Sequence, residues 1–170
     1  MLKALPAILQ VYPDAKVYVA GNKIANYQTW KDKIKISSYG KYIRELIKKY
    51  KLQENVVFLG RMSAGQMKEQ FLRSHVFVCP SVIENSPNSL GEAMLLGVPC
   101  VTARSGGIPS VFTDGEDGIA YPAYGASVYE NEEDKEQAQA NRLAQAVMQM
   151  WADEEKMLAY TRSAAAHARK

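Results

Sequence analysis

The chain has 170 residues, of which 47% are hydrophobic and 23% charged, as in an ordinary globular domain with a buried core. No apolar run reaches the roughly 18 residues of a transmembrane helix. The N-terminus lacks a signal-peptide pattern, because Lys3 is a lone charge and Pro6 breaks the apolar stretch. A net charge of +3 suits anionic substrates or an anionic membrane surface and does not call for nucleic acid.

Helical and extended patterns alternate along the chain. The helices show apolar residues at three- and four-residue spacing, and the strands are short apolar runs bounded by Gly or Pro. Local signals mark several boundaries: Ser63 and Gln66 have the form of a capping box, Asp153 can cap the last helix, Gly97 stops the helix at 90–96, and Asp117-Gly118 is a turn signal. In chain order we expect a helix at 2–12, a strand at 16–20, a helix at 39–50, a strand at 56–59, a helix at 63–73, a strand at 76–79, a helix at 90–96, a strand at 98–102, a helical turn at 109–112, a strand at 119–121, and helices around 143–151 and 153–165. This alternation predicts an α/β fold, a Rossmann-like parallel sheet flanked by helices.

The domain organisation follows from the same pattern. We expect a single domain over residues 1–170, with a core in about 1–122 and C-terminal helices in 137–169. The connections at 22–36 and 122–134 are polar and read as exposed loops. Ligands of parallel sheets bind at the carboxyl ends of the strands, so the loops at those ends are the candidate site.

The cysteines and histidines indicate neither a disulfide nor a metal site. Cys79 ends one predicted strand and Cys100 begins the next parallel one, so the two side chains lie at opposite edges of the sheet and cannot bridge. Both are expected as buried thiols in a reducing compartment. His75 and His167 are far apart in sequence and lack zinc-ligand spacing, so no metal is predicted.

The loop after the strand at 76–79 carries the clearest chemistry. Glu84 and Glu92 flank the mouth of a strand–loop–helix unit, with seven residues between them. Pro87 fits the first turn of a helix, and Asn88 or Ser89 can cap it. Free N–H groups at such a mouth suit a phosphate, and a carboxylate can accept two hydroxyl donors, as from a ribose diol.

These residues carry a family resemblance. The Glu84-x7-Glu92 pair is followed by Ala-Met, Gly97, Pro99 and the turn Ser-Gly-Gly-Ile-Pro at 105–109. The ordered combination resembles the C-terminal, donor-binding half of group 1 (family 4) retaining glycosyltransferases of the GT-B fold, over roughly residues 15–122. The Pro-Asn-Ser variant inside the motif is similar to that of bacterial polysaccharide enzymes.

The resemblance implies a site for a nucleotide-diphosphate sugar, without a metal or other cofactor. Glu84 would act at the donor sugar as the catalytic residue, and Glu92 would hold the ribose hydroxyls. The other donor-binding residues would act through backbone groups: Asn88, Ser89 and Leu90 at the phosphates, Gly106 and Gly107 near sugar and phosphates, and Gly60, Arg61 and Met62 at the nucleobase.

Two features depart from the family pattern. The family has an acidic residue directly after Gly-Gly-x-Pro, whereas this chain has Ser110, which can hydrogen-bond but supplies no negative charge. The family's domain opens with a strand bearing an Arg and a Lys that clamp the diphosphate, whereas the residues from Leu2 already read as the following helix. We therefore expect a fragment of a two-domain enzyme, with an open sheet edge that invites oligomerisation.

The implied parent is a cytoplasmic hexosyltransferase, or one at the inner membrane face, acting in bacterial polysaccharide biosynthesis. It would move the sugar to a glycan or lipid-linked acceptor held by an N-terminal domain. Two alternatives stay open. One is a nucleotide-sugar 2-epimerase of the same architecture, and the other is a non-catalytic fragment that binds nucleotide sugars.

Overall fold

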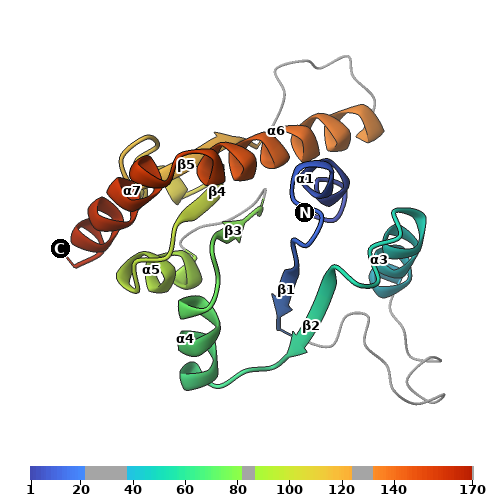
Figure 1. Cartoon of the computed structure of the whole chain (residues 1–170), viewed down its shortest axis with the longest axis horizontal. Coiled ribbons are helices and arrows are strands. Elements are labelled where there is room, and N and C mark those ends of the chain that lie inside the picture. Colours follow the sequence, from blue (N-terminus) through green and yellow to red (C-terminus); the bar gives the residue numbers. More distant parts are fainter. Residues whose placement is uncertain (22–37, 82–86, 124–131, 170) are drawn as a thin grey trace. The chain divides into compact units, whose positions relative to one another are not determined.

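A computed structural model describes residues 1–21, 38–81, 87–123 and 132–169 (Figure 1). It confirms the predicted fold class, because parallel strands alternate with helices that flank them. Within the described residues the strands form two sheets, β1-β2 and β3-β4-β5. The chain divides into two compact units, Leu2–Met67 and Lys68–Lys170, the second including Met1.

The unit Leu2–Met67 is built on a parallel strand pair. It contains helix α1 (Leu5–Val11), strand β1 (Val17–Ala20), helix α3 (Ser38–Lys49) and strand β2 (Val56–Gly60). The Asn55 side chain donates to the Ala15 carbonyl (3.0 Å) just before both strands begin. Helix α4 (Ala64–Leu72) starts in this unit with the predicted capping box, since Ser63 and Gln66 exchange side-chain and backbone hydrogen bonds.

The unit Lys68–Lys170 contains the three-stranded sheet. Its strands are β3 (Phe77–Cys79), β4 (Cys100–Arg104) and β5 (Gly118–Pro122), all parallel, with β4 in the centre. Its other elements are helix α5 (Asn88–Leu95), the 3-10 turn η1 (Ile108–Ser110) and helices α6 (Glu132–Ala152) and α7 (Glu154–His167). Helix α6 contacts β4 and β5, and α5 contacts β3, β4 and α7. The strand register sets Cys79 beside Thr102, and both cysteines are free and buried, as predicted.

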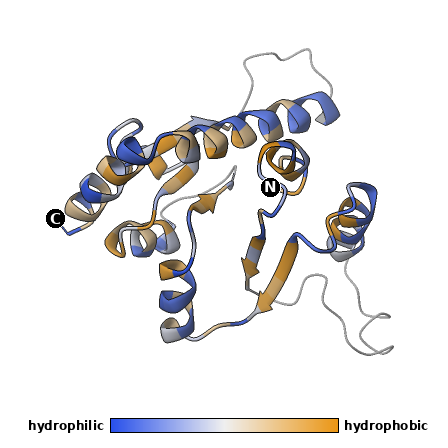
Figure 2. Ribbon diagram, in the orientation of Figure 1, coloured by the Kyte–Doolittle hydropathy of each residue, from blue (hydrophilic) through white to orange (hydrophobic). Residues whose placement is uncertain are grey.

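The largest difference from the expected elements is the start of α6. We expected an exposed loop up to residue 134, C-terminal helices from about residue 137 and an apolar stripe from Leu143, but α6 begins at Glu132. Its first turns carry Glu, Asp, Lys and Gln, and Figure 2 shows this end of the helix as hydrophilic. Such turns have good helix propensity without an apolar stripe, so periodicity misses them. The predicted cap of α7 is present, because Asp153 accepts from the Lys156 amide (2.9 Å).

Candidate functional site

The N-terminus of α5 differs in detail from the predicted one. The helix begins at Asn88, two residues before the predicted start, and Pro87 is its N-cap. Among the described residues no side chain caps this end, so neither Asn88 nor Ser89 is the capping residue. The Pro87 carbonyl accepts from the Leu90 amide (2.9 Å), while the first-turn N–H groups before it have no helical acceptor. The positive end of the helix dipole lies here, where an anion is favoured.

The side chains in the first turns of α5 differ in how far they are buried. Leu90 is fully buried and anchors the first turn in the core. Asn88 and Glu92 are exposed, and Ser89 is half-buried. Glu92 lies one turn into α5, and its role toward a ligand stays a prediction. Glu84, the predicted catalytic residue, lies outside the described residues.

The loop after β4 is joined to the end of β3 by one side chain. Ser105 donates through its hydroxyl to the carbonyl oxygen of Ser81 (2.7 Å), and Ser105 is only 8% exposed. Gly106 follows with a left-handed φ of +50°, a conformation that glycine adopts without strain. The fully buried Ile108 holds the far side of the loop. The Gly106–Gly107 pair and Ser81 therefore share the carboxyl edge of this sheet.

Ser110 is bound to the same loop. Its hydroxyl donates to the Gly107 carbonyl (2.7 Å), and its amide donates to that oxygen as well (3.1 Å). The side chain therefore closes the η1 turn back onto the glycine pair. A serine at this position stabilises the loop and carries no charge toward a ligand.

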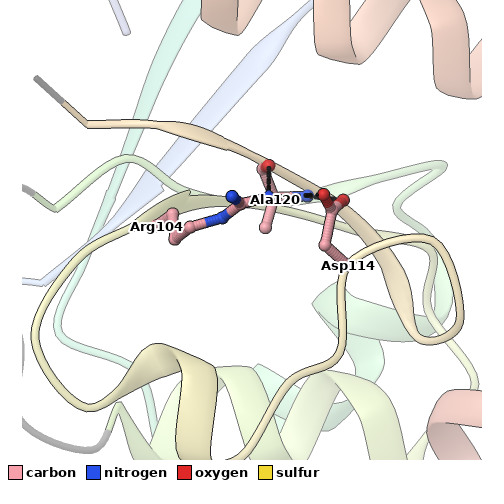
Figure 3. A network of polar contacts seen from close by, with 3 residues as sticks. All are labelled: Arg104, Asp114 and Ala120. Atoms are coloured by element: carbon pink, nitrogen blue, oxygen red, sulfur yellow. Dashed lines mark hydrogen bonds and ion pairs between the residues drawn. The ribbon is translucent and has the colours of Figure 1, made fainter. Parts of the chain in front are cut away.

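Arg104, which no motif indicated, lies directly before this loop at the end of β4. Its guanidinium pairs with Asp114 (2.6 Å) and reaches the Ala120 carbonyl (3.5 Å), while Asp114 accepts from the Ala120 amide (2.8 Å). Figure 3 shows the three residues together beside β5. The Ala120 amide and the Ala120 carbonyl thus each form a hydrogen bond with a side chain. The positive charge next to the glycine pair is engaged by a carboxylate on the β5 side.

The predicted nucleobase residues belong to the other compact unit. Gly60 ends β2 with φ +75°, and its carbonyl accepts from the Gly21 amide (2.9 Å), so the ends of β1 and β2 are joined. Arg61 is exposed and Met62 is half-buried in the connection that follows. The ten predicted site residues are therefore divided between the two units, apart from Glu84.

Sequence reasoning missed a buried polar cluster around Asp117. The predicted turn is present, since Asp117 lies in the turn that ends where Gly118 starts β5, but the burial of Asp117, only 2% exposed, was not predicted. Its carboxylate accepts from the Thr113 amide (2.8 Å) and contacts His167 Nδ1 (2.6 Å) near the end of α7. The two side chains are 50 positions apart, so no local pattern could have paired them. Among the described residues no cluster of His, Cys, Asp or Glu could hold a metal.

Comparison with known proteins identifies the class. Residues 1–167 match the sequence family described as glycosyl transferases group 1, and the chain belongs to that family. Spore coat protein SA of Bacillus subtilis (strain 168) is 29% identical over 119 residues, which are 69% of this chain and 29% of that protein. The chain thus spans under a third of that relative's length.

Solved structures agree on the fold. The C-terminal domain of a group 1 glycosyl transferase, LpcC from Francisella tularensis, superposes with a TM-score of 0.71 at 17% identity, covering 99% of this chain and 75% of that one. HepE from Anabaena, solved in complex with UDP-glucose, gives 0.73 at 21% identity over 98% of this chain and 38% of that one. The chain has the fold of a GT-B C-terminal domain. Within the described residues, no helix is both long enough and apolar enough to cross a membrane.

Proposed function

We propose that this chain is the donor-binding domain of a retaining glycosyltransferase that uses a nucleotide-diphosphate sugar. The observation that carries the proposal is the shared edge of the three-stranded sheet. Because α5 connects the parallel strands β3 and β4, its start, which no described side chain caps, lies at this edge with the Gly106–Gly107 loop. The Ser105–Ser81 hydrogen bond joins the two strand ends. Family membership and the UDP-glucose complex of HepE support a nucleotide sugar as the ligand.

The proposed chemistry uses backbone donors and two carboxylates. Breaking the bond between the anomeric carbon and the diphosphate oxygen leaves negative charge on the diphosphate. First-turn amides of α5, at Asn88 and Ser89, would stabilise that charge with the helix dipole. The Leu90 amide, predicted to act with them, already donates to the Pro87 carbonyl (2.9 Å) and is not available for this role. Glu92 would accept from the two ribose hydroxyls, and Glu84 would act at the sugar. The backbone around Gly60 to Met62 would face the nucleobase.

The finer identity of the enzyme belongs to the same proposal. The match to group 1 glycosyl transferases supports transfer over 2-epimerisation. We place the reaction in a reducing compartment, the cytoplasm, because Cys79 and Cys100 are buried free thiols. The acceptor would be a glycan or a lipid-linked sugar of a bacterial polysaccharide, bound by a further domain. Formation of free epimer by the full-length enzyme would contradict this assignment.

The first test is a thermal-shift titration with UDP, GDP, ADP and CMP, each with and without magnesium. Ligand binding raises the Tm by mass action, so a shift reports binding in the absence of turnover. We expect a shift with one nucleotide, indifferent to metal, that Glu92→Ala abolishes. The matched control is Glu69→Ala, an exposed glutamate on α4. Wild-type protein without a shift for any nucleotide would contradict the donor site.

We also propose that the 170-residue chain transfers no sugar by itself. A group 1 enzyme needs an acceptor site, and this chain spans only 29% of the related spore coat protein. Incubation with UDP-, GDP- and ADP-sugars and simple sugar acceptors should give no glycoside product by mass spectrometry. Turnover with any of these acceptors would overturn this part of the proposal.

A further inference from the structure

Two hydroxyl groups connect the carboxyl ends of β3 and β4. Thr102 is fully buried and donates to the Cys79 carbonyl (3.3 Å), inside the last register pair of the two strands. Ser105 donates to the Ser81 carbonyl (2.7 Å) beyond that pair, at positions that follow the ends of β4 and β3. The Ser105 bond therefore continues the strand pairing into the two loops, through a side chain.

The residues around Ser105 restrict the loop from both sides. Arg104, directly before it, is held toward β5 by Asp114 and the Ala120 carbonyl. Ser105 is held toward β3, and the glycine pair comes next. A segment fixed in two opposite directions loses little further freedom when a ligand binds, which favours affinity. The Gly106 and Gly107 amides thus start from a preorganised position.

We propose that Ser105 is a positioning residue for the diphosphate of the donor, a role that rests on the proposed function. Its hydroxyl keeps the Gly106–Gly107 loop at a fixed separation from Ser81, just after the end of β3. The Gly106 and Gly107 amides can then contact the diphosphate from a fixed position. Without the hydroxyl, the Ser81 carbonyl loses this donor and the Gly106–Gly107 loop is no longer held to the end of β3.

The test compares nucleoside diphosphates with monophosphates. Dissociation constants are measured by calorimetry for UDP and UMP, GDP and GMP, and ADP and AMP. In Ser105→Ala we expect the preference for the diphosphate to fall about fivefold, the worth of one hydrogen bond, with monophosphate affinity unchanged. Ser105→Thr keeps a hydroxyl and should restore most of the preference.

The matched control is Ser74→Ala. The Ser74 hydroxyl also donates to a backbone carbonyl, that of Gln70, over 2.7 Å, but it lies before β3, at the amino edge of the sheet. A merely structural serine would lower the Tm in both variants and leave the diphosphate preference intact. Only Ser105 is expected to change the preference.

A second measurement does not depend on nucleotide binding. Amide hydrogen exchange of the ligand-free protein should become faster in Ser105→Ala for peptides covering both 77–81 and 105–110. If wild type binds no nucleotide, the donor site fails and the diphosphate role fails with it, while exchange still reports whether the loops are coupled. If wild type binds and Ser105→Ala keeps its preference, or the exchange is unchanged, the positioning role is overturned and the donor site stands.

Discussion

At the scale of single residues, Gly118 shows how the backbone of one strand limits the residue on the next. Its φ is +148°, and an added Cβ would overlap the Cys100 carbonyl oxygen and lie 2.9 Å from Phe112 Cζ. The carbonyl belongs to β4 and cannot move without disturbing the β4–β5 pairing. We predict that Gly118→Ala lowers the free energy of unfolding by about 3 kcal/mol, measured by urea denaturation.

Gly65→Ala provides the comparison for this measurement. Gly65 lies in α4 with nothing near the position of an added Cβ, so alanine there should stabilise the helix by up to about 1 kcal/mol. Equal effects of the two substitutions would show that the close approach of β4 and β5 does not constrain Gly118.

The second residue-scale prediction concerns Cys100. Burial, together with Cys79 and Asp117 nearby, raises the pKa of the Cys100 thiol. Since the thiolate is the reactive form, this thiol stays protonated and inert near pH 8.5, where an ordinary cysteine ionises. We expect iodoacetamide to leave Cys100 unmodified in native protein at that pH and to alkylate it in urea, by peptide mass spectrometry. Equal rates in the two conditions would contradict the buried position.

At the scale of elements, β5 is an edge strand among the residues that the structure describes. It pairs with β4, and on the Ala120 backbone the Asp114 carboxylate and Arg104 guanidinium take the places of a further strand. The ion pair itself contributes little, because the two side chains are 42% and 52% exposed. What matters is that the Ala120 amide has a charged acceptor.

We therefore predict that Asp114→Ala lowers the free energy of unfolding by about 1.5 kcal/mol. Asp114→Asn keeps an oxygen acceptor and should retain more than half of this stabilisation. Glu116→Ala, an exposed acid in the same loop, should be close to neutral in urea denaturation. If Asp114→Ala is as neutral as Glu116→Ala, the carboxylate does not stabilise the edge of β5.

Element boundaries also show where local patterns suffice. The capping box at Ser63, the cap at Asp153 and the helix end at Gly97, which has φ +69°, were all predicted, because each depends on a few adjacent residues. The predicted start of α6, at about residue 137, lies after the observed start at Glu132, because its polar first turns show no apolar periodicity. The start of α5 was misplaced by two residues, because Pro87, Asn88 and Ser89 are all compatible with a cap.

At the scale of the whole molecule, the two compact units differ in the support that their strands receive. β4 has a strand on each side, and residues 100–103 are all buried. In β1, intermediate and exposed residues alternate, and β2 is the strand paired with it among the described residues. A two-stranded sheet has little stability of its own.

We predict that amides of β4 exchange with solvent at least tenfold more slowly than those of β1 in ligand-free protein, by hydrogen exchange with mass spectrometry. A nucleotide bound at the proposed donor site should slow exchange at the start of α5. Equal exchange in β1 and β4 without ligand would show that the two units are equally stable.

The sequence by itself determined the α/β class, the order of the elements and the family, because periodicity, caps and an ordered motif are local properties of the chain. It also nominated the residues of the donor site, and their roles remain predictions. Only the tertiary structure decided that Ser105 joins Ser81, that Asp117 meets His167 and that Arg104 and Asp114 satisfy Ala120. These contacts depend on strand register and on packing between residues 6 to 50 positions apart, which no local pattern specifies.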